Sequence, residues 1–271
     1  MRVLRDSSWL YYIGVRMKIV YMCGVDFSDV LKRHSSTIDD VSVVMPENEP
    51  LFPTEAQKAI EDFLGERAIK VPYEQAEIAR VLLDIDPDVI ISIGWRRILG
   101  ESLLNLLESR LVINIHPAIL PQYKGYHTEP YVIINGEREH GITAHRLTKR
   151  LDDGDIFHQV KFPISNFSTT ASIKKQTNDL MPEFVLELIS LIRIGKMRGV
   201  PQDHALTKVV APKRCPEDSR IDPEKSLSEL YNSIRACDSK KYPAYFYLDG
   251  QKVFISMWRA EDTPREHELE L

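Results

Sequence analysis

Two polar side chains close a buried, apolar run of the sequence. Asn114 and His116 alternate across Ile115 at the end of the segment LVINI, residues 111–115, and Pro117 follows them. Because alternate residues of a strand point to the same face, we expect the amide and the imidazole to lie side by side. A neutral imidazole beside a carboxamide can accept a proton while the amide stabilises an oxyanion. Taken alone, a histidine at a strand end also suits a structural role.

An acidic turn follows further along the chain. In the segment RLDDGDIF, Asp152, Asp153 and Asp155 surround Gly154. A carboxylate in this turn could orient His116 and stabilise its protonated form. Aspartate and glycine also cluster because both residue types suit turns, so that interpretation stays open for the motif.

The segments around these residues predict an α/β fold. The predicted strands are 18–23, 41–45, 88–93, 111–115, 142–147 and 156–160, and the predicted helices are 54–64, 73–83, 101–109 and 170–194. Strands that alternate with helices pair in parallel through right-handed crossovers, which predicts a doubly wound, Rossmann-like, mostly parallel sheet. In such sheets ligands bind beyond the carboxyl ends of the strands, where Asn114 and His116 fall.

One common use of this fold is disfavoured by the turn after the first strand. Residues 23–29 read CGVDFSD, which lacks the Gly-x-Gly-x-x-Gly fingerprint of dinucleotide-binding domains. Those glycines are needed for the tight turn and for the close approach of the pyrophosphate. The absence of this fingerprint therefore disfavours a dehydrogenase.

Three local signals suggest further boundaries. Thr54 can cap the predicted helix 54–64, and Asn135-Gly136 is typical of a hairpin turn. Asp249-Gly250 predicts a turn between strands 244–248 and 252–258.

The sequence becomes linker-like just after residue 200, in the segment PQDHALTKVVAPKR, and this change predicts a second domain. Ser226 and Glu229 have the spacing of a capping box and predict the start of a short helix. We expect an N-terminal extension (1–16), a catalytic domain (17–205) and a small C-terminal α+β domain that ends in a mobile tail (206–271).

Composition narrows the class of protein. The chain has 271 residues, of which 43% are hydrophobic and 28% charged, as in globular proteins with a sizeable core. The net charge of −5 does not indicate the basic face of a nucleic-acid binder. No apolar run reaches the roughly 18 residues of a membrane span, and no cleavage site follows the mildly apolar residues 9–15. The three cysteines lie far apart without zinc spacing, which favours free thiols in the cytoplasm and no metal site.

In combination, these residues resemble the 10-formyltetrahydrofolate-dependent formyltransferases. That family includes methionyl-tRNA formyltransferase, glycinamide ribonucleotide transformylase and the sugar N-formyltransferases. The resemblance covers residues 17–200 and continues less specifically through 213–223 and 242–255. The residues that carry it are Asn114, His116, Pro117, Leu120, Pro121, Gly125, Gly136, Gly141, Thr143, His145, Leu151, Asp152, Gly154 and Asp155.

The resemblance implies a catalytic role for Asn114, His116 and Asp152. Asp152 is preferred to its acidic neighbours because the family places its aspartate at the first acidic position of the turn. By this resemblance, Asn114 and His116 stabilise or protonate the oxyanion that forms when an amine attacks the formyl carbon. Asp152 holds His116 and helps to relay the proton of the amine, and His145 supports the site.

The resemblance also implies two binding regions. The formyl donor, 10-formyltetrahydrofolate, would contact Gly94, Trp95, Arg96, Arg97, Ile98, Thr143, Asp153, Gly154 and Asp155. The acceptor would contact Tyr123, Lys124, Gly125 and Tyr126. Two alternatives stay open, because Trp95 also suits an ordinary core position and Lys124 also suits a solvated loop.

The identity of the acceptor amine is less constrained. Residues 206–271 hold eleven Lys and Arg against twelve Asp and Glu, which disfavours a tRNA substrate, as does the small size expected for that domain. Glycinamide ribonucleotide transformylase is a single domain and its turn usually reads closer to ELDxGP.

Sugar N-formyltransferases resemble the chain in length and in the loops GWRRIL and IINGE. We therefore expect a nucleotide-linked amino sugar as acceptor, in bacterial surface-polysaccharide synthesis, and a homodimer. Methionyl-tRNA formyltransferase is the alternative, and a folate-binding protein without turnover is the non-enzymatic one. The nucleotide, the ring position of the amine and the sugar stereochemistry are not specified by the sequence.

Overall fold

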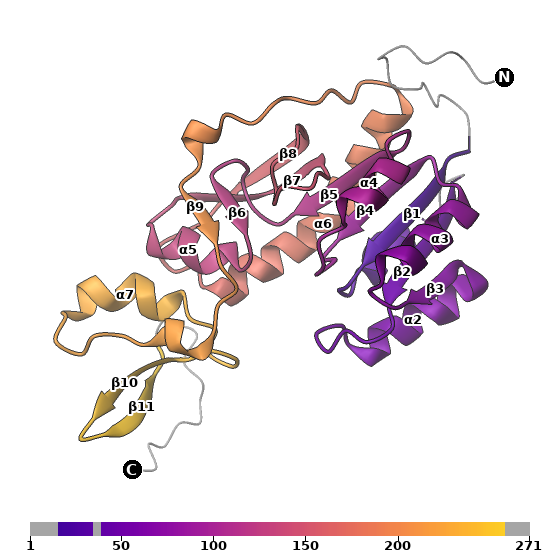
Figure 1. Cartoon of the computed structure of the whole chain (residues 1–271). Helices are drawn as coiled ribbons and strands as arrows, with labels where there is room; N and C mark the ends of the chain where they lie inside the picture. The colour runs from indigo at the N-terminus through magenta and orange to yellow at the C-terminus, as the bar shows by residue number, and fades with distance from the viewer. Residues whose placement is uncertain (1–15, 35–38, 258–271) are drawn as a thin grey trace. The chain divides into compact units, whose positions relative to one another are not determined.

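The computed structural model of the chain describes residues 16–34 and 39–257 (Figure 1). Within these residues the main sheet has seven strands in the order β3-β2-β1-β4-β5-β7-β8. Its first five strands pair in parallel, and β7 runs antiparallel to β5. The predicted mostly parallel, Rossmann-like sheet is thus confirmed. The strands are β1 (Lys18–Cys23), β2 (Asp40–Pro46), β3 (Ala68–Val71), β4 (Val89–Ile93), β5 (Leu111–His116), β7 (Glu139–Arg146) and β8 (Ile156–Pro163).

Helices cover both faces of the parallel part of the sheet. One apolar core joins the strands to α1 (Ser28–His34), α2 (Thr54–Leu64) and α6 (Thr170–Arg193). A second core, on the other face, joins them to α3 (Gln75–Ile85) and α4 (Glu101–Leu106). Every residue of β4 is buried, as expected of a central strand that is apolar on both sides.

The register of β5 positions the polar residues at its carboxyl end. Asn114 lies opposite Ser92 of β4 on one side and opposite His145 of β7 on the other. His116 lies opposite Thr143 of β7. The antiparallel partner strand therefore brings His145 directly beside Asn114, where cross-strand side chains touch.

The chain divides into two compact units. Of the described residues, the first comprises 16–34, 39–124, 141–160 and 177–208, and the second comprises 125–140, 161–176 and 209–257. The second unit thus includes two segments, 125–140 and 161–176, from the range expected for the catalytic domain, and the domain bounds expected from the sequence stay a prediction. The predicted extension, residues 1–16, lies almost wholly outside the described residues.

The second unit has a small core of its own, formed by Ile221, Leu230, Ile234 and Ala244. Its capping box is confirmed, since Ser226 and Glu229 bond to one another's backbone N–H. The predicted hairpin is also confirmed, although its second strand ends at Ile255 and not at the expected residue 258, which lies outside the described residues. The elements of this unit are α5 (Thr128–Ile134), α7 (Leu227–Arg235), β9 (Val209–Ala211), β10 (Ala244–Leu248) and β11 (Gln251–Ile255).

Two of the local predictions were wrong. Asn135-Gly136 does not form a hairpin turn but ends α5, in a Schellman motif. Gly136, at a φ of 67°, donates to the carbonyl of Ile133, and the next N–H donates to Val132. Thr54 is the first residue of α2 rather than its cap, since Pro53 holds the cap position without a side-chain bond.

No helix of the part of the chain that the structure describes is both long enough and apolar enough to cross a membrane.

Candidate active site

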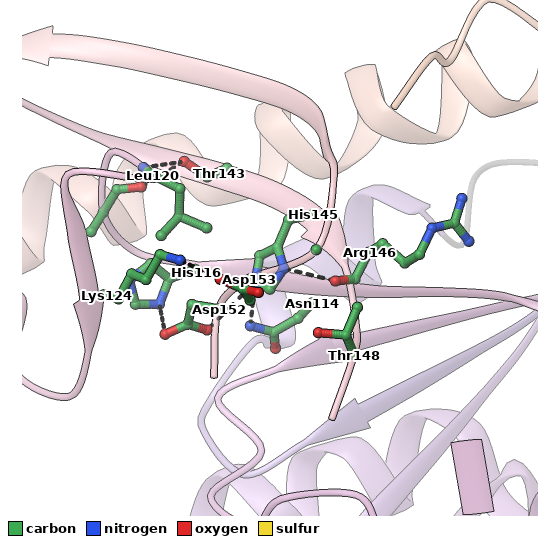
Figure 2. Close-up of polar contacts among 12 residues, drawn as sticks. Asn114, His116, Leu120, Lys124, Thr143, His145, Arg146, Thr148, Asp152 and Asp153 are labelled. Atoms are coloured by element: carbon green, nitrogen blue, oxygen red, sulfur yellow. Dashed lines mark hydrogen bonds and ion pairs between the residues drawn. The ribbon is translucent and has the colours of Figure 1, made fainter. Parts of the chain in front are cut away.

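His116 is buried and held through one of its two ring nitrogens. Its Nε2 lies 2.9 Å from the carbonyl oxygen of Tyr123, and because a carbonyl only accepts, Nε2 carries the hydrogen. The neutral imidazole therefore presents the lone pair of Nδ1. That nitrogen lies 3.6 Å from Oδ2 of Asp152, beyond the usual hydrogen-bond distance (Figure 2). Nδ1 is thus left to receive a proton, with a carboxylate beside it.

Asn114 is oriented by His145. Nδ1 of His145 donates to the carbonyl of Arg146 at 2.9 Å, so Nε2 of the neutral ring is an acceptor. It accepts from Nδ2 of Asn114 at 3.1 Å (Figure 2). The amide nitrogen is thereby fixed on the His145 side, and its second hydrogen can donate to an oxyanion.

Asp152 lies between the two imidazoles. One carboxylate oxygen is 3.6 Å from Nδ1 of His116 and the other is 3.5 Å from Nε2 of His145. Burial lowers the pKa of His116, and His145 lowers it further, while Asp152 and the bond to Tyr123 oppose this shift. His116 is therefore neutral at neutral pH, which is the form that can act as a base.

The backbone of the acidic turn fixes the position of Asp152. Asp152 has a φ of 47°, in the left-handed region that few residues other than glycine adopt. Gly154 has no room for a side chain, because a Cβ there would overlap the carbonyl of Arg146. The N–H of Arg146 in turn donates to the carbonyl of Asp155 at 2.9 Å. The turn is thus tied to the end of β7.

Lys124 forms a shielded ion pair with Asp153 of the acidic turn. Nζ of Lys124 lies 2.6 Å from Oδ1 of Asp153, and the lysine is only 6% exposed. Lys124 holds the pKa of the Asp153 carboxyl below its usual value. His204 lies 3.4 Å from the same ammonium group. The structure therefore places Lys124 in a buried ion pair and not in a solvated loop, while its contact with the acceptor stays a prediction.

Thr143 has a complete set of partners within the protein. Its hydroxyl donates to the carbonyl of Ala118 at 2.7 Å and accepts from Leu120 at 3.2 Å and from Gln159 at 2.9 Å. It shapes the loop that follows His116.

The loop after β4, residues 94–98, contains donors that suit a polar ligand. Nε1 of Trp95 is buried and has no hydrogen-bond partner among the described residues, whereas Nε of Arg96 faces a carboxylate oxygen of Glu49. Such an orphan donor is costly in a folded protein unless a ligand or water satisfies it. A flat, acceptor-rich pterin fits that requirement, so the loop fits the expected folate.

The side chains of this loop rest partly on Tyr73. The Trp95 ring meets it edge-on with ring centres 5.4 Å apart, and the Arg97 guanidinium lies 4.9 Å from its ring centre. Arg96 lies 3.5 Å from Glu49, whereas Ile98 is 64% exposed. Trp95 also packs against the core shared by α3 and α4, and its contact with the folate stays a prediction.

Gly125 and Tyr126, both expected at the acceptor, belong to the second unit. The N–H of Tyr126 donates to Ala211 of β9, and its side chain is 39% exposed. Tyr123 belongs to the first unit, and its ring is buried. It contributes to the site through its backbone carbonyl, which accepts from His116.

A cavity of about 530 Å³ lies elsewhere in the first unit, among α1, α2 and α6. Its walls include Phe27, Ile60, Ile93 and Met181. Of the described residues that line it, none is a site residue expected from the sequence.

Several residues around the site had not been expected. They are Glu49, Tyr73, Gln159, Gln202 and His204. None belongs to a recognised motif. Gln202 and His204 stand in a segment that resembles a linker, where no periodicity signals burial.

Comparisons with known proteins agree with this geometry. A family model described as formyl transferase matches residues 26–189. Methionyl-tRNA formyltransferase of Thermotoga neapolitana is 33% identical over 190 residues, which are 70% of this chain and 60% of that protein. The chain therefore spans about 60% of the length of this curated relative.

Solved structures show the same fold. A 4-N formyltransferase from Francisella tularensis aligns with a TM-score of 0.63 at 21% identity, covering 89% of this chain and 97% of that one. WlaRD, a sugar 3N-formyl transferase solved in the presence of dTDP and 5-N-formyl-THF, aligns with a TM-score of 0.62 at 19% identity, covering 81% of this chain and 78% of that one.

Formyl transferases use 10-formyltetrahydrofolate, so the expected donor is confirmed for the family. The chain belongs to the formyl transferase family.

Proposed function

We propose that this protein transfers a formyl group from 10-formyltetrahydrofolate to the amine of a nucleotide-linked amino-deoxy sugar. The observation that carries the transfer chemistry is the buried His116, whose Nδ1 faces Asp152 while its Nε2 is held by a backbone carbonyl. Such a site offers one base, one carboxylate and, from Asn114, one oxyanion donor.

Each residue has a distinct part in the proposed reaction. The amine nitrogen bonds to the formyl carbon, and the bond from that carbon to N10 of the folate breaks. Asn114 donates to the formyl oxygen as it gains negative charge. Nδ1 of His116 takes the proton that the amine loses, and this proton ends on N10. Asp152 stabilises the imidazolium that forms in between.

Two observations support a sugar acceptor. The solved structures with this fold include WlaRD, a sugar 3N-formyl transferase of which this chain covers 78%. Residues 206–271 also carry no excess of positive charge with which to hold a polyanion such as tRNA. The curated sequence relatives support the alternative acceptor, methionyl-tRNA, because they are methionyl-tRNA formyltransferases.

The test is release of tetrahydrofolate, followed by absorbance, with a panel of acceptors. The panel holds amino sugars linked to dTDP, GDP and UDP, together with methionyl-tRNA and glycinamide ribonucleotide. Turnover with one amino-sugar nucleotide alone is the expected result, and it also identifies the nucleotide. Turnover with methionyl-tRNA alone would replace the sugar by tRNA as acceptor.

Asp152→Asn serves as the matched control, because it preserves shape and removes the charge. Release of tetrahydrofolate that the variant leaves unchanged would come from another source. Folate binding without turnover on any acceptor would contradict the proposed activity and favour a binding protein.

The predicted homodimer, the cytoplasmic location and the role in surface polysaccharide belong to the same proposal. Light scattering of the purified protein tests the first, and a mass near that of one chain would contradict it.

A further inference from the structure

Residues 200–208 cross the catalytic turn and are bonded to it at several points. Val200 and Ile156 exchange two backbone hydrogen bonds of 2.9 Å each. Further on, the N–H of Lys208 donates to the carbonyl of Gln122 at 2.9 Å. We call this segment the strap. It ties the start of β8 to the loop that carries Lys124, and it passes the acidic turn in between.

The side chain of Gln202 makes the central contact of the strap. Its Nε2 donates to the carbonyl of Asp152 at 2.9 Å and to the carbonyl of Gly154 at 2.7 Å. Both amide hydrogens are thus used, and Gln202 is only 9% exposed. Its Oε1 is buried without a hydrogen-bond partner among the described residues, so the side chain is held by its donor end alone.

The turn needs such an external hold. Asp152 adopts a φ of 47°, which costs a residue other than glycine on the order of 1 kcal/mol and persists only where the surroundings enforce it. The carboxylate of Asp152 must also stay between His116 and His145, at 3.6 and 3.5 Å. Small displacements matter at such distances, because misplacing a catalytic group by about 1 Å can cost roughly a hundredfold in rate.

We propose that Gln202 is a positioning residue, which clamps the left-handed turn so that the carboxylate of Asp152 faces Nδ1 of His116. This inference rests on the proposed function for its rate effects but not for its geometry. The residue acts through Asp152 and touches neither reactant.

The first test is independent of turnover. The pKa of His116 is measured by NMR of ¹⁵N-histidine-labelled protein in the wild type, Gln202→Met, Asp152→Asn and the double variant. Asp152 raises the pKa of His116, so a displaced carboxylate lowers it. We expect Gln202→Met to lower it as Asp152→Asn does, and to add nothing in the Asp152→Asn background. Equal effects of Gln202→Met in both backgrounds would overturn the proposal.

The second test measures turnover. We expect kcat to fall about ten- to a hundredfold in Gln202→Met, with KM for folate and acceptor little changed. Gln202→Glu sets a carboxylate against two carbonyl oxygens, so kcat is expected to fall further in this variant. A variant that keeps wild-type kcat would contradict the role of Gln202. An inactive wild type would instead contradict the proposed function and leave the NMR result to decide this one.

Gln57→Leu is the matched control. Gln57 is also buried, at 8% exposure, and it also bonds through Nε2, to the carbonyl of Phe52. Its loss is expected to lower the melting temperature while the pKa of His116 stays unchanged. A shift of that pKa in Gln57→Leu would show that the effect is general destabilisation.

Discussion

Two of the buried histidine–aspartate pairs of the first unit, His34–Asp39 and His116–Asp152, differ in which ring nitrogens remain available. His34 is wholly enclosed: Tyr21 donates to its Nδ1 at 2.8 Å, and its Nε2 donates to Asp39 at 3.0 Å. Arg193 lies 2.5 Å from the same carboxylate and balances its charge. At His116 only Nε2 is bound, and Nδ1 faces Asp152 across 3.6 Å.

The comparison distinguishes the two pairs by how completely their hydrogen bonds are formed and not by their residue types. At His34 every polar atom of the ring has a hydrogen-bond partner, which makes the cluster a brace between β1, α1 and α6. At His116 the carboxylate is near enough to stabilise an imidazolium but too far to hold the neutral ring. The same two residue types thus stabilise the fold at His34, and at His116 they are available for the proton transfer of the proposed reaction.

The largest effect is expected from removing His116. His116→Ala loses the base and should lower kcat about a thousandfold, with the melting temperature changed by only a few degrees. Tetrahydrofolate release and thermal unfolding are the two measurements. A variant that keeps near-wild-type turnover would remove His116 from the proposed reaction.

The converse is expected at His34. His34→Leu leaves Asp39 buried beside Arg193 without its imidazole and should cost about 3 kcal/mol in the free energy of unfolding. Urea denaturation measures this loss. The kcat of the folded fraction should equal that of the wild type, and a selective loss of kcat would mean that the brace also serves catalysis.

An intermediate effect is expected from Asp152→Asn. The amide keeps the shape of the carboxylate but no longer stabilises an imidazolium, so kcat should fall about a hundredfold. Substrate binding, measured by titration calorimetry, should be nearly unchanged. The corresponding change at the brace, Asp39→Asn, should lower stability and leave kcat unchanged. A fall of kcat in Asp39→Asn would contradict a purely structural role of that pair.

The smallest effect concerns pH. Burial lowers the pKa of both His34 and His116 from the ordinary value of about 6.5. Below that value the unfolded chain binds protons that the folded chain does not, so stability should fall as the pH drops from about 6.5 through the folded pKa values. His34→Leu should flatten this dependence. The acidic limb of kcat/KM should also lie below pH 6.5, and a limb above it would contradict a lowered pKa at His116.

Much of the fold could be predicted because a buried strand requires a run of apolar residues that are adjacent in the sequence. β1 and β10 begin and end where their apolar runs do, and Asn114 with His116 could be placed on one face of a strand from alternation alone. Asn135-Gly136 was misleading because the same dipeptide supplies a left-handed residue to hairpins and to helix ends.

The supporting residues of the site could not be found in the same way. Gln202 reaches carbonyls 48 and 50 positions earlier, and His204 reaches Lys124 across 80 positions. Such contacts depend on how the chain folds back on itself, and the residues on either side of Gln202 contain no pattern that reports it. The sequence also could not show that Thr143 and Asp153 have hydrogen-bond or ion-pair partners within the protein. Both residue types can contact either the protein or a ligand, so their expected folate contacts stay predictions.

The antiparallel pairing of β5 with β7 has a consequence for how a sample of this protein should be judged. Asn114 meets His145 only in one register, and a slip by one residue would oppose it with Ala144 or Arg146. A misregistered molecule could still be compact and well folded by most spectroscopic measures, yet its amide would lack the imidazole that orients it. Titration of active sites would therefore count correctly paired strands, and the specific activity of a refolded preparation would report on the fidelity of β-sheet assembly.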